Sequence, residues 1–341
     1  MNIPRIILPF LLLAQGTITV CHAQDSRPSY MPDIHGTIRA KYEYAPQTNR
    51  GRSEVRNARV SVNGKIVPQI SYKAEIDLSD EGKIKMLDAY ARFSSKSLMT
   101  SIAMGQMRVP FTIDAHRSPH RQYFANRSFI AKQVGNVRDV GVSAAHSFGE
   151  TVPVTVEGGI FNGSGLTDQK DYWTRSYNFS VKTTVCFLER FTAVAGVQKT
   201  RPEDISIIMW NAGAFYYTSL WHIEAEYLRK NYSDGAFPGV NAIDAFASRR
   251  FPVRKFANGI SVLARYDYMS DHSDGIKDEN GVLTANDAER HRLTFGTTLH
   301  FGTKKIFADL RVNYEKYFYN KSTTPNVSER DKIVVELMCR F

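Results

Sequence analysis

Residues 34–44 read IHGTIRAKYEY, and their side chains alternate between two kinds along the whole stretch. Ile34, Gly36, Ile38 and every second residue after them are apolar, aromatic or small, whereas the residues between them, such as Arg39 and Lys41, are polar. Successive side chains of a β-strand point to opposite faces, so a period of two indicates a strand with one apolar face and one polar face. We therefore predict a β-strand at residues 34–44.

The same alternation recurs along the chain, for example in ISYKAEIDL (residues 70–78) and WHIEAEYL (residues 221–228). Helical periodicity is confined to residues 125–133, and no internal repeat or Pro/Gly-rich linker divides the chain. Sixteen strands are predicted, at residues 34–44, 53–62, 69–78, 85–94, 98–107, 137–147, 151–161, 175–187, 191–199, 207–217, 219–230, 242–251, 258–269, 289–301, 305–316 and 332–341.

The connections between these strands alternate in length. Those after even-numbered strands are short, such as FGE (148–150), whereas those after odd-numbered strands are longer and polar, such as NYSDGAFPGVN (231–241). Outer-membrane barrels have an even number of antiparallel strands, short periplasmic turns and longer outer loops. A soluble β-sandwich does not sort its loops in this way. We predict an all-β fold, a single transmembrane β-barrel domain over residues 24–341.

The two ends of the chain agree with export to the bacterial outer membrane. Residues 1–23 combine Arg5, a short apolar run and the ending CHA, which is the plan of a cleaved signal peptide. A lipoprotein reading, with Cys21 as the mature N-terminus, is the alternative, although small residues do not precede Cys21. At the other end, KIVVELMCRF resembles the terminal strand of outer-membrane barrels, and Phe341 is the predicted membrane-insertion signal for the barrel-assembly machinery.

Composition argues against other classes of protein. The chain has 44 Lys and Arg against 34 Asp and Glu, a net charge of +10, but the cations are spread over many strands and are interleaved with acids, so nucleic-acid binding is not expected. Cys186 and Cys339 are expected to stay unpaired. We find no Ser, His and acid grouping for catalysis, no metal-ligand cluster and no cofactor motif, so the sequence predicts neither an enzyme nor a bound metal or cofactor.

Several motifs resemble the phosphate-selective porin O/P family. IAMGQMRVPFT (102–112) resembles its GQ-x-[KR]-x-PF element, RSFIAKQVGNVRDVGV (127–142) its ERS…GRD-[IV]-GV element, and GIFNGSG (159–165) its FNG-[ST]-G hairpin end. Asn126 stands where the family often has Glu, and Val137 where it often has Gly. The resemblance implies a trimeric, sixteen-stranded channel with an inward-folded third loop. Some members of the family select phosphate or polyphosphate.

The long stretch after the fifth predicted strand is the candidate third loop, folded into the lumen. Between Arg108 and Asp139 it carries six Lys or Arg and two His against two Asp, together with aromatic residues that can anchor it to the inner wall. Rings of cations line anion pores, and Arg offers a planar fork to phosphate oxygens. The predicted constriction cations are Arg108, Arg117, Arg121, Arg127 and Lys132. The predicted lumen-facing cations are Arg39, Lys41, Arg59, Lys73, Arg92, Arg265 and Arg311.

Lumenal carboxylates leave a second interpretation of these cations open. Glu75, Asp77, Asp88, Glu224 and Asp267 fall on the same predicted face, and any of the cations can pair with them instead of facing water. A lumen with both signs of charge predicts a modest anion preference. The predicted function is an outer-membrane diffusion porin that prefers anions and, by the resemblance, phosphate; the expected partners are small anions, outer-membrane lipid, lipopolysaccharide and two further copies of the chain. The alternative is a barrel that acts as an adhesin or a structural scaffold.

Overall fold

The computed structural model describes residues 31–341 except 135–136, 167–168, 202–204, 236, 254–255, 274–278, 280, 283, 304 and 321–324. The predicted signal peptide, residues 1–23, and Cys21 within it lie outside the described residues. Sixteen strands form, and their ends lie within a few residues of the predicted ones. The strands are β1 (Asp33–Ala45), β2 (Arg50–Val67), β3 (Ile70–Asp80), β4 (Lys83–Ser95), β5 (Thr100–Arg108), β6 (Arg138–Phe148), β7 (Val154–Phe161), β8 (Asn178–Phe187), β9 (Phe191–Thr200), β10 (Ile207–Tyr217), β11 (Trp221–Tyr232), β12 (Val240–Phe251), β13 (Gly259–Met269), β14 (Arg290–Gly302), β15 (Phe307–Tyr319) and β16 (Lys332–Arg340).

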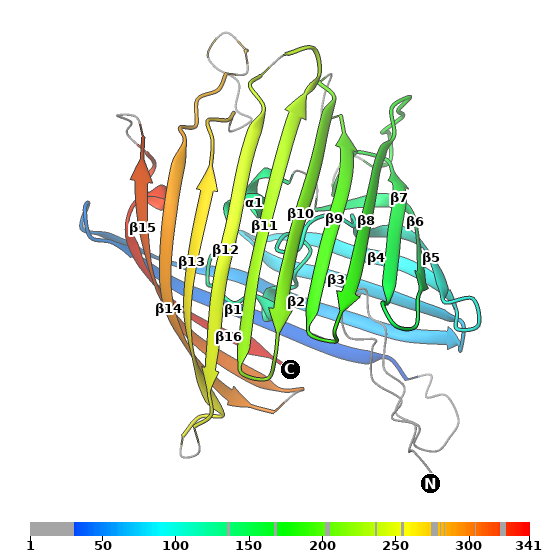
Figure 1. Ribbon diagram of the computed structural model, residues 1–341, viewed down its shortest axis with the longest axis horizontal. Helices are drawn as coiled ribbons and strands as arrows, with labels where there is room; N and C mark the ends of the chain where they lie inside the picture. Colours follow the sequence, from blue (N-terminus) through cyan, green and yellow to red (C-terminus); the bar gives the residue numbers. More distant parts are fainter. Residues whose placement is uncertain are drawn as a thin grey trace.

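The strands close into one antiparallel barrel in which each strand pairs with its neighbours in sequence and β1 pairs with β16 (Figure 1). Along β1, Ile38 and Tyr42 are exposed on the outer face, while Arg39 and Lys41 are buried on the inner face. β16 repeats the arrangement with Leu337 outside and Glu336 inside. The alternation read from the sequence therefore gives the barrel an apolar outer wall and a polar inner wall.

Helical structure is sparse, as the sequence predicts. α1 (Phe129–Gln133) lies within the expected range of residues 125–133 and contacts β12 and β13 (Figure 1). Three single-turn 3₁₀ helices accompany it: η1 (Pro119–Arg121), η2 (Ser233–Gly235) and η3 (Val327–Glu329). Among the described residues, no helix has the length and apolar character of a membrane span.

Loop lengths differ from the prediction at two connections. β1 and β2 are joined by residues 46–49 and β3 and β4 by residues 81–82, so these two turns are as tight as those at the opposite end of the barrel. Asn49, Glu81 and Gly82 adopt positive φ angles of 50°, 45° and 88°, which lets a hairpin reverse within few residues. The strands therefore extend into residues that the sequence indicated as loop. The remaining connections after odd-numbered strands are longer.

A β-bulge changes the expected faces of β4. Glu75 pairs with Asp88, but Ile76 pairs with Met86, so Leu87 is left over between them. Leu87 and Asp88 are consequently both buried, whereas strict alternation places them on opposite faces.

Candidate pore constriction

Residues 109–134 and 137, here called the inner segment, lie between β5 and β6 and pack against the inner wall. Phe129 and Ile130 of α1 are 0% exposed and belong to one apolar cluster with Met209 of β10, Leu228 of β11 and Met269 of β13. A second anchor is Phe124, whose ring lies edge-on to that of Phe246 at 5.5 Å between centroids. Leu228 and Phe246 follow the same alternation as their buried polar neighbours. The apolar residues that the sequence singled out therefore hold the segment against the polar face of the barrel.

Wall side chains also satisfy the irregular backbone of the inner segment. The N–H groups of Ile113, Ala125 and Phe129 donate to Glu226 (2.8 Å), Asn313 (2.8 Å) and Asp267 (3.1 Å). The carbonyl oxygens of Ala125, Asn126 and Arg127 accept from Arg39 (2.7 Å), Arg265 (3.0 Å) and Arg292 (2.8 Å). Buried backbone groups without regular structure need such partners. Bonds from β1, β11, β13, β14 and β15 therefore define the path of the segment.

Two of the five predicted constriction cations are compensated by carboxylates. Arg117 forms ion pairs with Asp114 and Glu224, and its guanidinium lies 5.2 Å from the ring centroid of Tyr123. Burial lowers the pKa of Arg117, but the nearby carboxylates of Glu224 and Asp114 outweigh burial and hold the pKa above its ordinary value. Lys132 pairs with Glu329 of η3 at 2.9 Å. Arg117 and Lys132 are therefore paired with acids, as the second interpretation of the sequence expected, and are not free cations.

The other three constriction cations have no carboxylate within ion-pair distance among the described residues. Arg127 donates to the carbonyl oxygens of Asp114 (2.9 Å), Ala115 (3.1 Å) and Arg117 (3.0 Å). Burial lowers its pKa to about 10, so it remains protonated at neutral pH. Arg108 donates to the carbonyl oxygen of His116 at 2.5 Å. Arg121, in η1, is exposed. Neutral carbonyl partners hold a guanidinium in place without cancelling its charge.

The predicted lumen-facing cations lie on the inner face, where most of them form ion pairs with acids. The guanidinium of Arg92 lies 5.2 Å from the Tyr90 ring centroid. The pairs are Arg39 with Glu336 (2.8 Å from Nε), Arg311 with Glu336 (2.6 Å), Lys41 with Glu43 (2.8 Å), Arg59 with Asp77 (2.9 Å), Lys73 with Glu75 (2.7 Å) and Arg265 with Asp267 (2.8 Å). In the described structure, the predicted wall cations are thus largely charge-compensated, whereas Arg108 at the end of β5 and Arg121 and Arg127 of the inner segment are not.

One further cation, Lys182 of β8, was not singled out from the sequence. It follows the inward alternation of Asn178 and Ser180, and no carboxylate lies within ion-pair distance of it in the part of the chain described. Burial, and after it the positive charges of Lys182 and Arg108, hold the pKa of His116 well below its ordinary range. Burial, Arg340 and Arg121 do the same to His120. Both histidines are therefore neutral and lie within a positive field.

Phe341 has a structural position at the seam of the barrel. Its backbone exchanges two hydrogen bonds with Gly36 of β1, Gly36 N–H to Phe341 O at 2.6 Å and Phe341 N–H to Gly36 O at 3.1 Å. A Cβ atom on Gly36 would lie 2.3 Å from the Phe341 ring, so the glycine makes room for the terminal aromatic side chain. Its predicted role as an insertion signal stays a prediction, and the ring also covers the β1–β16 closure.

The inner wall offers acids and cations for ion pairing, but no metal centre within the described ranges. Groups of three or more His, Cys, Asp or Glu side chains arranged to hold a metal ion do not occur there. Cys186 and Cys339 are both unpaired. What the arrangement offers chemically is a polar inner surface with fixed positive charges.

Comparison with known proteins supports this architecture. Residues 34–188 match the family model described as phosphate-selective porin O and P, which confirms the predicted resemblance over β1 to β8. No curated protein matches the sequence. Among solved structures, the anion-selective porin from Comamonas acidovorans is 9% identical and superposes with a TM-score of 0.66, over 91% of this chain and 99% of that one.

Two further solved structures have similar folds. The outer membrane channel DcaP of Acinetobacter baumannii is 14% identical, with a TM-score of 0.59 over 91% of this chain and 96% of that one. OmpT, an outer membrane protein of Vibrio cholerae solved in a trimer form, is 10% identical, with a TM-score of 0.60 over 91% and 98%. At such identities the likeness establishes the fold alone.

Proposed function

We propose that this outer-membrane porin, whose residues 34–188 match the phosphate-selective porin O and P family, is a diffusion channel that prefers anions and passes phosphate. The observation that carries the proposal is the difference between the predicted wall cations and the cations at or beside the inner segment. Nearly all the predicted wall cations pair with acids, whereas Arg108, Arg121 and Arg127 do not. Ions that pass the inner segment therefore meet a net positive charge.

Phosphate fits the kind of donor at this position. A guanidinium presents several N–H groups in a rigid plane that matches two oxygens of one phosphate, and a lysine adds a point charge. Arg121 is exposed and Lys182 faces the lumen from β8, so donors of both kinds border the passage. The compensated wall keeps the preference moderate, because paired charges attract neither sign strongly.

The channel is set in the bacterial outer membrane. Residues 1–23 direct export and are cleaved, the terminal strand ending at Phe341 is read by the assembly machinery, and three copies associate in the outer membrane, where they contact lipid and lipopolysaccharide. The passage is non-enzymatic: solutes cross by diffusion along their gradients.

Planar-bilayer recording of the purified protein tests the proposal. We expect discrete conductance steps in KCl and a smaller chloride current when phosphate is added at low concentration. The variant that tests the phosphate effect is Arg121→Gln, which keeps the side chain polar and removes one uncompensated charge. A complete absence of steps would favour the adhesin or scaffold function. If phosphate reduces the current equally in the wild type and in Arg121→Gln, phosphate does not bind at Arg121.

A further inference from the structure

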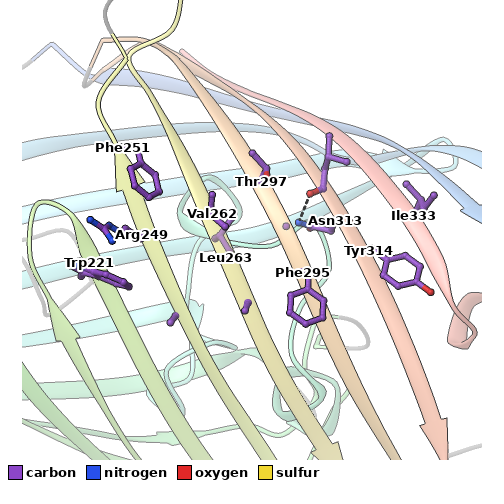
Figure 2. Close-up of a pocket in the computed structure, with 14 residues that line it drawn as sticks. Trp221, Arg249, Phe251, Val262, Leu263, Phe295, Thr297, Asn313, Tyr314 and Ile333 are labelled. Atoms are coloured by element: carbon purple, nitrogen blue, oxygen red, sulfur yellow. Dashed lines mark hydrogen bonds between the residues drawn. The ribbon is translucent and has the colours of Figure 1, made fainter.

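The outer wall carries a hollow that the channel function does not use. It has a volume of about 790 Å³ and lies across β11 to β16 (Figure 2). Its floor consists of short outward-facing side chains, including Ala247 and Ala264, which are direct partners across β12 and β13. Large rings border it: Trp221 and Phe251 at one end, and Phe295 and Tyr314 towards the other. The result is an apolar depression in a surface that is otherwise lined with larger side chains.

The strand register gives the hollow an elongated shape. One row of partners runs across five strands from Trp221 through Arg249, Val262 and Thr297 to Val312. Adjacent strands lie about 4.8 Å apart, so the distance from β11 to β16 along such a row is roughly 24 Å. Trp221 begins β11 directly after a short turn, whereas Ile333 lies near the start of β16, after a long connection. The hollow therefore runs obliquely from the short-turn end of the barrel towards the loop end.

A cation marks the short-turn end of the hollow. Arg249 is exposed on the outer face of β12, and its guanidinium lies 5.0 Å from the ring centroid of Trp221 and 4.9 Å from that of Phe251. Among the described residues, no carboxylate lies within ion-pair distance of it. A cation on the lipid-facing wall is unfavourable unless it reaches the polar interface, and aromatic residues favour that same depth. Arg249 is thus expected at the depth of the lipid headgroups, and its positive charge is available to bind an anion.

From this geometry we infer a glycerophospholipid-binding site in which one acyl chain occupies the hollow and the headgroup phosphate binds Arg249. The inference rests on the proposed outer-membrane location, in which the short turns face the periplasm and the lipid comes from the periplasmic leaflet. An elongated apolar hollow with a single cation at one end complements a molecule with a long chain and an anionic head. A contact with a second copy of this chain would not explain why a single cation lies at one end of the hollow, whereas a lipid headgroup does.

Native mass spectrometry of the detergent-solubilised protein with added phosphatidylglycerol tests the site. We expect retained lipid on the wild-type protein and about fivefold weaker retention by Arg249→Gln, with Arg249→Lys in between. Ala264→Trp fills the floor and should abolish the retained lipid. The matched controls are Arg190→Gln, an exposed arginine in the β8–β9 turn, and Ala212→Trp, an exposed outward alanine on β10. Both controls should retain lipid like the wild type.

Two results would overturn the inference. One is equal lipid retention by Arg249→Gln, Ala264→Trp and their controls. The other is a change of oligomeric state in Ala264→Trp with lipid retention intact, which would assign the hollow to a contact between copies. Heat-dependent gel mobility of the folded barrel verifies that each variant folds. Bilayer conductance separates this site from the channel, because lipid retention without conductance contradicts only the proposed function, and conductance without lipid retention contradicts only the site.

Discussion

Arg121 offers the most direct perturbation of ion selectivity, because it is exposed and has no carboxylate within ion-pair distance in the described structure. We consider Arg121→Gln, which removes one charge and keeps a polar side chain. A unit charge about 4 Å from a passing ion contributes about 1 kcal/mol in water. Screening at 0.1 M salt, where the Debye length is about 10 Å, reduces this to about 0.7 kcal/mol.

The substitution acts on both ions in opposite directions. Anions lose that stabilisation and cations lose an equal repulsion, so the relative permeability changes by about 1.4 kcal/mol, or roughly tenfold, at closest approach. The assay is the zero-current potential in a KCl gradient across a planar bilayer. Arg249→Gln is the control, since it makes the same chemical change on the opposite face of the wall. Equal shifts for the two variants, or none for Arg121→Gln, would refute a role for Arg121 in the passage.

Three further variants or conditions probe the anchor of the inner segment, its two histidines and the barrel seam. Phe129→Ala should cost about 3–5 kcal/mol of packing energy and therefore speed tryptic cleavage at Arg127 and Lys132. The control Phe179→Ala, at an exposed position, should leave cleavage unchanged. Unchanged cleavage in Phe129→Ala would show that Phe129 does not anchor the inner segment. The pKa values of His116 and His120 are lowered, so both side chains stay neutral, and anion preference should be constant between about pH 5.5 and 8. Their contribution to stability is present above the unfolded pKa of about 6.5 and is lost as the pH falls. A rise in anion preference with a midpoint near pH 6.5, about the unperturbed value, is the contrary result. Gly36→Ile should lower the yield of folded barrel, since a Cβ there meets the Phe341 ring, while the outward Ala40→Ile should not; equal yields would show that the ring moves aside easily.

Local alternation is enough to predict the barrel wall. The face of each side chain in IHGTIRAKYEY follows from a period of two, and the exposed Ile38 and buried Arg39 bear it out. Alternation fails where the backbone departs from ideal pairing, as at the bulge that buries both Leu87 and Asp88. Tight hairpins are equally hard to predict, because Asn49 and Glu81 adopt positive φ angles. Such angles are uncommon for residues other than glycine, so the sequence does not indicate them.

The charge balance of the site depends on contacts between residues far apart in sequence. Arg39 and Glu336 are 297 residues apart and meet only because β1 and β16 close the barrel. The sequence therefore predicts the same role for Arg117 and Arg127. Only the folded chain shows that Arg117 pairs with Glu224, whereas Arg127 donates to backbone carbonyl oxygens. Lys182 was overlooked because its significance arises from its neighbours His116 and Arg108, which a linear reading does not bring together.

Uncompensated cations at the inner segment should make the channel prefer anions. The zero-current potential of the wild-type protein in a tenfold KCl gradient measures this preference. We expect a potential with the sign of the chloride equilibrium potential, reduced in size because the wall cations are paired with acids. A potential with the sign of the potassium equilibrium potential would show that the channel prefers cations instead.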